Sequence, residues 1–215
     1  MSALFDLSRV FFGGRQRRAP PEEEEDEDDE GYEADVFTSQ RRVANTTKTP
    51  LRLLCLHGRG SNNDITSIQL VSLNLHTTAE IDLLQGGIEA DPANVAFDQL
   101  SQRSFRSWLD GSAEAESAMR RVLRTVQKHG PYDGIYGFSQ GAAVAAFLSI
   151  PGMAEKLGGA RTWKFIVCAC GVATGLAEIK ATYFDEGGHE REDSMTIDLP
   201  SLHIIGEKDP YGRLS

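Results

Sequence analysis

The chain has 215 residues, which is enough for one domain of ordinary size, or for one domain with a tail. Its formal net charge of −10 argues against a nucleic-acid-binding surface, and the absence of any apolar run of about 18 residues argues against an integral membrane segment. Three cysteines are too few for a disulfide framework and favour a reducing compartment, so we expect a cytoplasmic protein, with the nucleus as an alternative.

Residues 1–48 are predicted to form a disordered, acidic tail. Nine consecutive carboxylates run from Glu22 to Glu30, and such a run repels itself and has no apolar side chains to bury. The segment acts either as a solubilising linker or as an arm for a basic partner, and the sequence does not choose between them. Residues 1–18 mix apolar and basic side chains, which loosely suits an organelle-targeting helix, so targeting is a further alternative.

From residue 50 onwards, apolar runs typical of buried strands alternate with segments of helical periodicity. We expect strands at 51–56, 79–84, 133–138, 163–169 and 201–205. We expect helices between them at 64–76, 113–129 and 139–148. Residues 85–110 look irregular, and residues 171–198 are a long segment predicted to form part of a lid or pocket wall. Such alternation indicates an α/β protein whose mostly parallel sheet is covered on both faces.

Three polar turns follow strands of this predicted sheet, at 57–63, 137–141 and 206–210. In open parallel sheets, ligands bind outside the carboxyl ends of the strands. We therefore expect the functional residues to lie in these three turns.

The turn at 137–141 has the pattern G-x-S-x-G between a strand and a helix. Ser139 is the predicted nucleophile, since the pattern lifts a hydroxyl clear of the sheet on a tight turn, and Gly137 and Gly141 remove side chains that would clash there. The backbone N–H groups of Gln140 and Arg59 are the predicted oxyanion hole, with Gly58 in the loop that carries Arg59. The alternatives are a structural glycine-serine turn and an ordinary strand-to-helix turn.

Asp209 follows the strand at 201–205 and precedes Pro210. A carboxylate at this place can accept a histidine N–H, fix its tautomer and stabilise the imidazolium ion. Asp209 is therefore the predicted acid of a catalytic triad, and a solvated turn residue before proline is the alternative.

Three motifs resemble the FSH-type family of serine hydrolases, a branch of the α/β-hydrolases similar to the carboxylesterase and acyl-protein thioesterase group. They are LLCLHG at 53–58, GFSQGA at 137–142 and PSLHIIGEKD at 200–209. The resemblance implies an α/β-hydrolase three-layer sandwich over residues 50–215 and hydrolysis of a small-molecule carboxylic ester or thioester through an acyl-serine intermediate, without a cofactor or metal. The oligomeric state is not readable from the sequence.

The family places its catalytic histidine after the acid, and none of the six residues that follow Asp209 is histidine. One interpretation is a chain cut short at its C-terminus, without the last strand and helix of the fold; a catalytically silent, hydrolase-like binding protein is the alternative. The triad histidine is thus unknown. His189 is interpreted as a loop residue, His57 as shaping its own loop, and His203 as a packing residue in a strand. Cys168 and Cys170 are interpreted as core residues, with both thiols on one face of a strand.

Overall fold

The computed structural model describes residues 37–40, 49–110, 112–171 and 196–207. The elements in chain order are β1 (Phe37–Gln40), β2 (Leu51–Leu56), α2 (Asn63–Ser72), η3 (Leu75–Thr77), β3 (Ala79–Leu84), β4 (Ile88–Glu89), α3 (Phe97–Leu100), β5 (Arg106–Ser107), α4 (Ser112–His129), β6 (Gly134–Phe138), α5 (Gln140–Leu148), α6 (Met153–Lys156), β7 (Phe165–Ala169) and β8 (Ser201–Ile204).

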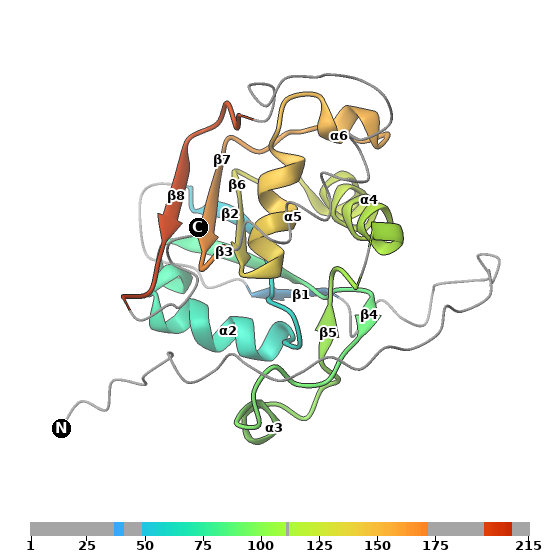
Figure 1. Cartoon of the computed structure of the whole chain (residues 1–215). Helices are drawn as coiled ribbons and strands as arrows, with labels where there is room; N and C mark the ends of the chain where they lie inside the picture. The colour runs from blue at the N-terminus through green and yellow to red at the C-terminus, as the bar shows by residue number, and fades with distance from the viewer. Residues whose placement is uncertain (1–36, 41–48, 111, 172–195, 208–215) are drawn as a thin grey trace.

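The described strands form a six-stranded sheet in the order β1-β3-β2-β6-β7-β8 (Figure 1). All neighbouring pairs are parallel except β1 and β3, which are antiparallel. The short strands β4 and β5 pair separately as an antiparallel ribbon. The mostly parallel sheet predicted from the alternation of strands and helices is thus confirmed.

Residues 37–40 differ from the prediction of a disordered tail. They form β1, in which Phe37 lies opposite Leu84 of β3 and stacks on the His129 ring with centroids 4.3 Å apart. The prediction was wrong for these four residues because the acidic composition stops at Asp35, and Phe37 finds a place against the end of α4. The other residues of the predicted tail lie outside the described ranges.

The helix predicted at 64–76 is shorter than expected. Asn62 caps α2 by accepting a hydrogen bond from the Ile65 N–H at 3.0 Å, and the helix ends at Ser72. Asn74 then adopts a left-handed conformation with φ of 58°, which asparagine tolerates better than most residues. This turn separates α2 from the short η3.

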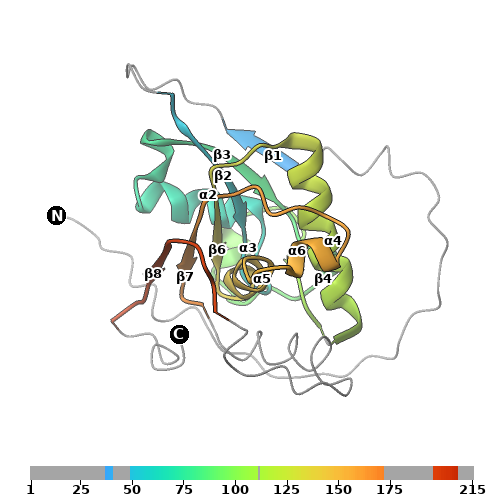
Figure 2. The same cartoon turned by 90° about the horizontal axis from the view of Figure 1, so that it is seen from above.

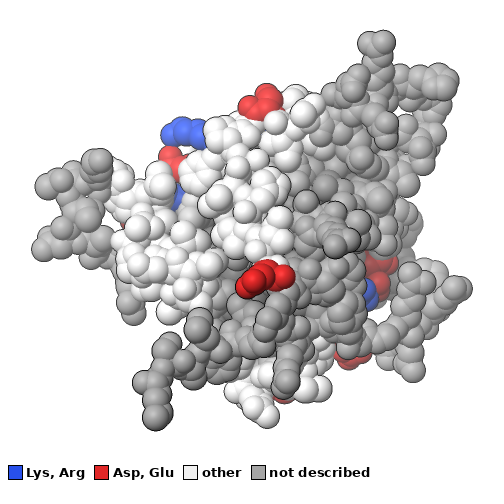
Figure 3. Space-filling model, turned by 60° about the vertical axis from the view of Figure 1, so that its left-hand side comes forward, with Lys and Arg blue, Asp and Glu red and all other residues white. Residues whose placement is uncertain are grey.

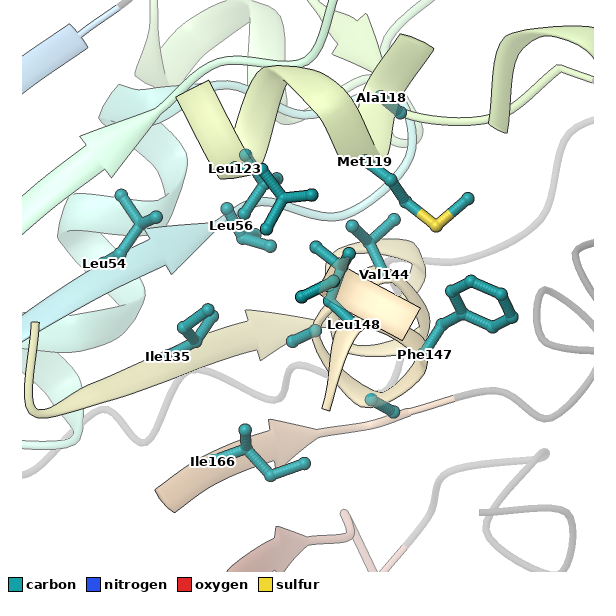
Figure 4. Close-up of a cluster of buried hydrophobic side chains, with 14 of the residues drawn as sticks. Leu54, Leu56, Ala118, Met119, Leu123, Ile135, Val144, Phe147, Leu148 and Ile166 are labelled. Carbon is teal, nitrogen blue, oxygen red and sulfur yellow. The ribbon is translucent and has the colours of Figure 1, made fainter. Parts of the chain in front are cut away.

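Helices cover both faces of the sheet and make three layers (Figure 2). Leu54 and Leu56 of β2 point to the face covered by α4, α5 and α6, whereas Leu53 and Cys55 point to the face covered by α2. Figure 4 shows the first of these clusters, where Met119 and Leu123 of α4 lie over Val144 and Leu148 of α5. Burying alternate residues on both faces explains why these strands read as continuous apolar runs.

The helix predicted at 113–129 is confirmed as α4, and one side of it is apolar. Met119, Val122, Leu123 and Val126 are all buried in the cluster between α4 and the sheet. Lys128 and His129 end the helix, where positive charge interacts favourably with the helix dipole.

The connections from β2 place two of the predicted turns, 57–63 and 137–141, next to each other. The chain goes from β2 through α2 to β3 on one side, and then returns through α4 to β6 on the other side of β2. The strand order therefore reverses at β2, and the carboxyl ends of β2 and β6 are the position at which open α/β sheets bind ligands.

The face that carries β8 and α2 has few charged side chains in its described part (Figure 3). Leu202 and Ile205 remain exposed at β8, as do Ile68 and Val71 on α2. Within the described ranges, no helix combines the length and the apolar character needed to cross a bilayer.

Candidate active site

Ser139 lies on the tight turn between β6 and α5, as predicted from the motif. Its φ of 51° and ψ of −113° place it in a conformation that non-glycine residues rarely adopt. The backbone is held there because Ser139 N–H donates to Ala169 O at 2.8 Å and Ser139 O accepts from the Ala142 and Ala143 N–H groups. Ser139 is half-buried and lies in a strained turn, the conformation typical of a nucleophilic serine between a strand and a helix.

The two glycines of the motif are needed because backbone groups lie against them. A Cβ at Gly137 would be 2.5 Å from the Ala142 N and Cα atoms. A Cβ at Gly141 would be 2.5 Å from the His57 carbonyl oxygen and 2.6 Å from that of Leu56. The first turn of α5 therefore lies directly on the end of β2, which brings the loop after β2 next to the serine.

The predicted oxyanion loop lies beside the serine. A Cβ at Gly58 would be 3.4 Å from Ser139 Cβ and 2.9 Å from Phe138 Cδ1, so the loop lies in contact with the serine and a larger residue would require the Phe138 ring to move. Arg59 is exposed, and neither its backbone N–H nor that of Gln140 donates to another group in the described part of the chain. Two N–H groups at the carboxyl ends of β2 and β6 are thus available to donate hydrogen bonds to an oxygen that develops negative charge.

The Gln140 side chain has a role that the sequence did not suggest. Its Oε1 accepts from the Trp108 N–H at 2.8 Å and its Nε2 donates to the Leu109 carbonyl at 2.7 Å. Both groups of the amide are used, which fixes the segment after β5 against the start of α5. The motif predicted Gln140 only for its backbone N–H.

His57 is completely buried at the end of β2, where both ring nitrogens have backbone partners. The Gly58 carbonyl can only accept, so Nδ1, 2.6 Å away, carries the proton; Nε2 accepts from the Gly86 N–H at 2.8 Å. The ring also packs against Trp108, whose indole N–H donates to the His57 carbonyl at 2.8 Å. With no free nitrogen, His57 is not available as the base, and the prediction that it shapes its loop agrees with these contacts.

Unfolding should show an extra pH dependence that comes from His57. Burial is the main cause that lowers the pKa of His57 to about 4; the bond to Gly58 opposes this, and the Arg106 charge adds to it. Between pH 6.5 and 4 the unfolded chain takes up a proton that the folded chain does not, so the unfolding free energy falls as the pH falls. At about 1.4 kcal/mol per pH unit the loss is on the order of 3 kcal/mol.

The measurement is urea unfolding of the wild type and of His57→Asn between pH 7 and 4.5. Carboxylates titrate in both proteins, so the difference between the two curves isolates the histidine. The wild type should lose more stability on acidification than the variant. Parallel curves would contradict the assignment of a neutral His57.

Other predicted residues fall outside this site. Asp209 and His189 lie outside the described residues. His203 is exposed on β8, so the prediction that it packs inside was wrong: β8 is the outermost of the described strands on its side of the sheet, and Ser201, Leu202 and His203 are all exposed. Cys168 packs toward α5, whereas Cys170, with φ of 48°, packs toward the opposite face, so the prediction that both thiols share a face was also wrong.

The aromatic residues near the site are mostly interior. Trp108 is fully buried, and Phe105 packs against Phe97 with centroids 6.3 Å apart.

The described residues offer no metal site. Among them, no three His, Cys, Asp or Glu side chains are grouped closely enough to hold a metal ion. The three cysteines are free thiols.

The sheet topology, the strained serine turn and the adjoining glycine loop define a serine hydrolase of the α/β-hydrolase fold. A family model described as "Serine hydrolase (FSH1)" matches residues 46–213, and the chain belongs to this family. The chain is 27% identical over 176 residues to Esterase FUS5 of Gibberella moniliformis, an alignment that covers 76% of this chain and 69% of that protein.

Two further proteins are similar to this chain over different shares of its length. The chain is 32% identical over 111 residues to Hydrolase FUB4 of Gibberella moniliformis, an alignment that covers 49% of this chain and 41% of that protein. The crystal structure of Zea mays acyl-protein thioesterase 2 covers 79% of this chain and 88% of its own, with 18% identity and a TM-score of 0.46.

Proposed function

We propose that this serine hydrolase cleaves a small-molecule carboxylic ester or thioester through an acyl-Ser139 intermediate. The observation that supports this most directly is the strained backbone of Ser139 at the β6–α5 turn, with φ of 51°. Strain of this kind persists only where the surrounding structure holds it, and it is concentrated at reactive residues.

In the proposed reaction, Ser139 Oγ forms a bond to the carbonyl carbon while its proton passes to a base. The N–H groups of Arg59 and Gln140 donate hydrogen bonds to the carbonyl oxygen as it becomes negatively charged, and each donor is worth about 3 kcal/mol of the barrier. The alcohol or thiol leaves with the proton from the base, and water then releases the acid by the same sequence of steps. Asp209 is the proposed partner that orients the base, and the base itself is not among the described histidines.

The hydrogen bonds of His57 argue against this histidine as the base. His57 is the histidine at the carboxyl end of β2, and both of its ring nitrogens are occupied. A serine without a base is a weak nucleophile, so the proposal requires a second histidine held by the carboxylate. A cytoplasmic location is part of the same proposal and rests on the reduced cysteines.

The experiment is labelling of the purified protein with a fluorophosphonate probe, with the modified residue located by mass spectrometry. We expect a single adduct on Ser139 and none in Ser139→Ala. Ser72→Ala is the matched control, because Ser72 lies exposed at the end of α2, and it should label at the wild-type rate. Release of p-nitrophenol from short-chain esters should likewise be lost in Ser139→Ala and stay at the wild-type rate in Ser72→Ala.

Labelling that persists in Ser139→Ala would contradict the proposal. A folded wild-type protein that reacts with neither probe nor esters would instead support the hydrolase-like binding protein. Thermal melts of all three proteins separate these results from unfolding.

A further inference from the structure

His57 forms a hydrogen bond to the peptide unit that carries one of the two proposed oxyanion-hole donors. Its Nδ1–H donates at 2.6 Å to the carbonyl oxygen of Gly58. That carbonyl belongs to the same peptide unit as the N–H of Arg59, one of the two proposed donors. The carbonyl that accepts from His57 and the Arg59 N–H therefore lie in the same rigid, planar peptide unit.

The plane fixes where the Arg59 N–H points. Among the described residues the only cis peptide bond is that between Gly130 and Pro131, so the unit between Gly58 and Arg59 is trans. In a trans unit the carbonyl and the N–H point in opposite directions. Because the Gly58 carbonyl faces the buried imidazole, the Arg59 N–H faces away from the interior, on a loop that lies against Ser139.

The alternative orientation is within reach of this loop. Gly58 has no Cβ, and glycine tolerates almost any rotation of its neighbouring peptide planes. If the unit flipped, the Gly58 carbonyl would face outwards in place of the Arg59 N–H, and its partial negative charge would repel the oxyanion. The hydrogen bond from His57 opposes this flip, and by polarising the peptide it also strengthens the N–H as a donor.

The ring is itself fixed by its other neighbours. Gly86 N–H donates to Nε2 at 2.8 Å, which leaves the proton on Nδ1, where the Gly58 carbonyl needs it. Trp108 Nε1 donates to the His57 carbonyl at 2.8 Å, and its ring packs beside the imidazole. Two segments far from the loop in sequence thus set the tautomer and the position of His57.

We propose that His57 is a positioning residue that holds the Gly58–Arg59 peptide with its N–H directed at the reacting carbonyl oxygen. This inference rests on the proposed function and assigns His57 no proton transfer. Its contribution is a donor that is already in place when charge develops, so that no rearrangement is needed at that moment.

Two substitutions separate the two hydrogen bonds of the ring. His57→Asn places an N–H group one bond from Cγ, as Nδ1 is, and can still donate to the Gly58 carbonyl, while it loses the Gly86 contact. His57→Gln places its amide near Nε2 and can accept from Gly86, while it loses the donor to Gly58. Both variants remove the ring that packs against Trp108, so each is the control for the other.

The measurement is the rate constant of fluorophosphonate labelling at saturating probe, together with kcat and KM for a p-nitrophenyl ester. Removal of one oxyanion-hole donor costs about 10²–10³ in kcat. We expect His57→Gln to lose about 10²-fold in both rate constants with little change in KM, and His57→Asn to stay within about tenfold of the wild type. Melting curves establish that each variant is folded at the assay temperature.

The outcomes distinguish this inference from the proposed function. A wild type that reacts with neither probe nor ester overturns the function and the inference together. A reactive wild type with equal rates for the two variants overturns only the inference. Imidazole ¹⁵N resonances of the wild type give an independent check that needs no variant: a proton on Nδ1 at pH 7 is expected, and a proton on Nε2 would overturn the proposal.

Discussion

Replacing Gly141 by alanine should lower the unfolding free energy by roughly 2–4 kcal/mol and slow the labelling of Ser139 by about 10²-fold. Gly141 lies in the first turn of α5, where alanine would ordinarily improve helix propensity by about 1 kcal/mol. The new Cβ, however, would lie 2.5 Å from the His57 carbonyl oxygen and 2.6 Å from that of Leu56. Both are backbone atoms in the sheet, so the helix must move, and the steric cost exceeds the gain in propensity.

The displacement also explains the expected loss of activity. Moving α5 away from β2 separates the Gln140 N–H from the loop that carries Arg59, and a change of about 1 Å can cost 10²-fold in rate. Urea unfolding gives the stability, and the fluorophosphonate assay gives the reactivity. Gly87→Ala is the matched control, since its Cβ would meet only the end of the Arg121 side chain at 3.4 Å. Equal stability of Gly141→Ala and the wild type would contradict the close packing of α5 on β2.

The residues that sequence reasoning placed correctly are those fixed by local sterics or by burial on both sides. β2, β6 and β7 lie inside the sheet, so their apolar runs are continuous and hard to mistake. Gly137, Ser139 and Gly141 are positioned by the turn itself, because each occupies a place that few other residues can adopt. Local constraints of this kind depend on a few residues that are adjacent in the sequence, so the sequence alone predicts them.

The contacts that reasoning missed join segments distant in the chain. β1 depends on pairing with β3, more than forty residues further on, and its four residues carry no signal strong enough to predict that pairing. The Gly86 N–H donates to His57 and the Trp108 N–H donates to Gln140, and both donors lie in the stretch at 85–110 that was predicted to be irregular. A single sequence shows which hydrogen bonds these side chains can form, but it does not show with which residues they form them.

A second network, which joins the middle of β3 to the amino ends of β2 and β6, makes a prediction independent of catalysis. Asp82 of β3 is buried, and its Oδ2 accepts from Arg52 Nη2 at 3.1 Å and from the Tyr132 hydroxyl at 2.9 Å. Arg52 also donates to the carbonyls of Pro131 and His129, and its guanidinium carbon lies 5.0 Å from the centre of the Tyr132 ring. One guanidinium therefore joins β2 to β3 and to the turn that precedes β6.

Arg52→Met should destabilise the protein by about 3–5 kcal/mol, because it leaves the Asp82 carboxylate buried with only a hydroxyl to compensate it. Methionine keeps the length of the side chain, so the loss reflects charge and hydrogen bonds more than a cavity. The double variant Arg52→Met/Asp82→Leu should recover most of the stability, since removing both charges of a buried pair is often neutral. A double variant no more stable than the single one would show that the guanidinium acts through the Pro131 and His129 carbonyls instead.

Catalysis should not follow this loss, because Arg52 and Ser139 lie at opposite ends of the parallel strands. Arg52 is the second residue of β2, whereas Ser139 directly follows the last residue of β6. At a temperature where Arg52→Met is folded, its labelling rate should equal that of the wild type, in contrast to Gly141→Ala. Unfolding in urea and labelling of the same samples separate the two ends of the sheet: one end sets stability alone, and the other sets both stability and the geometry of the nucleophile.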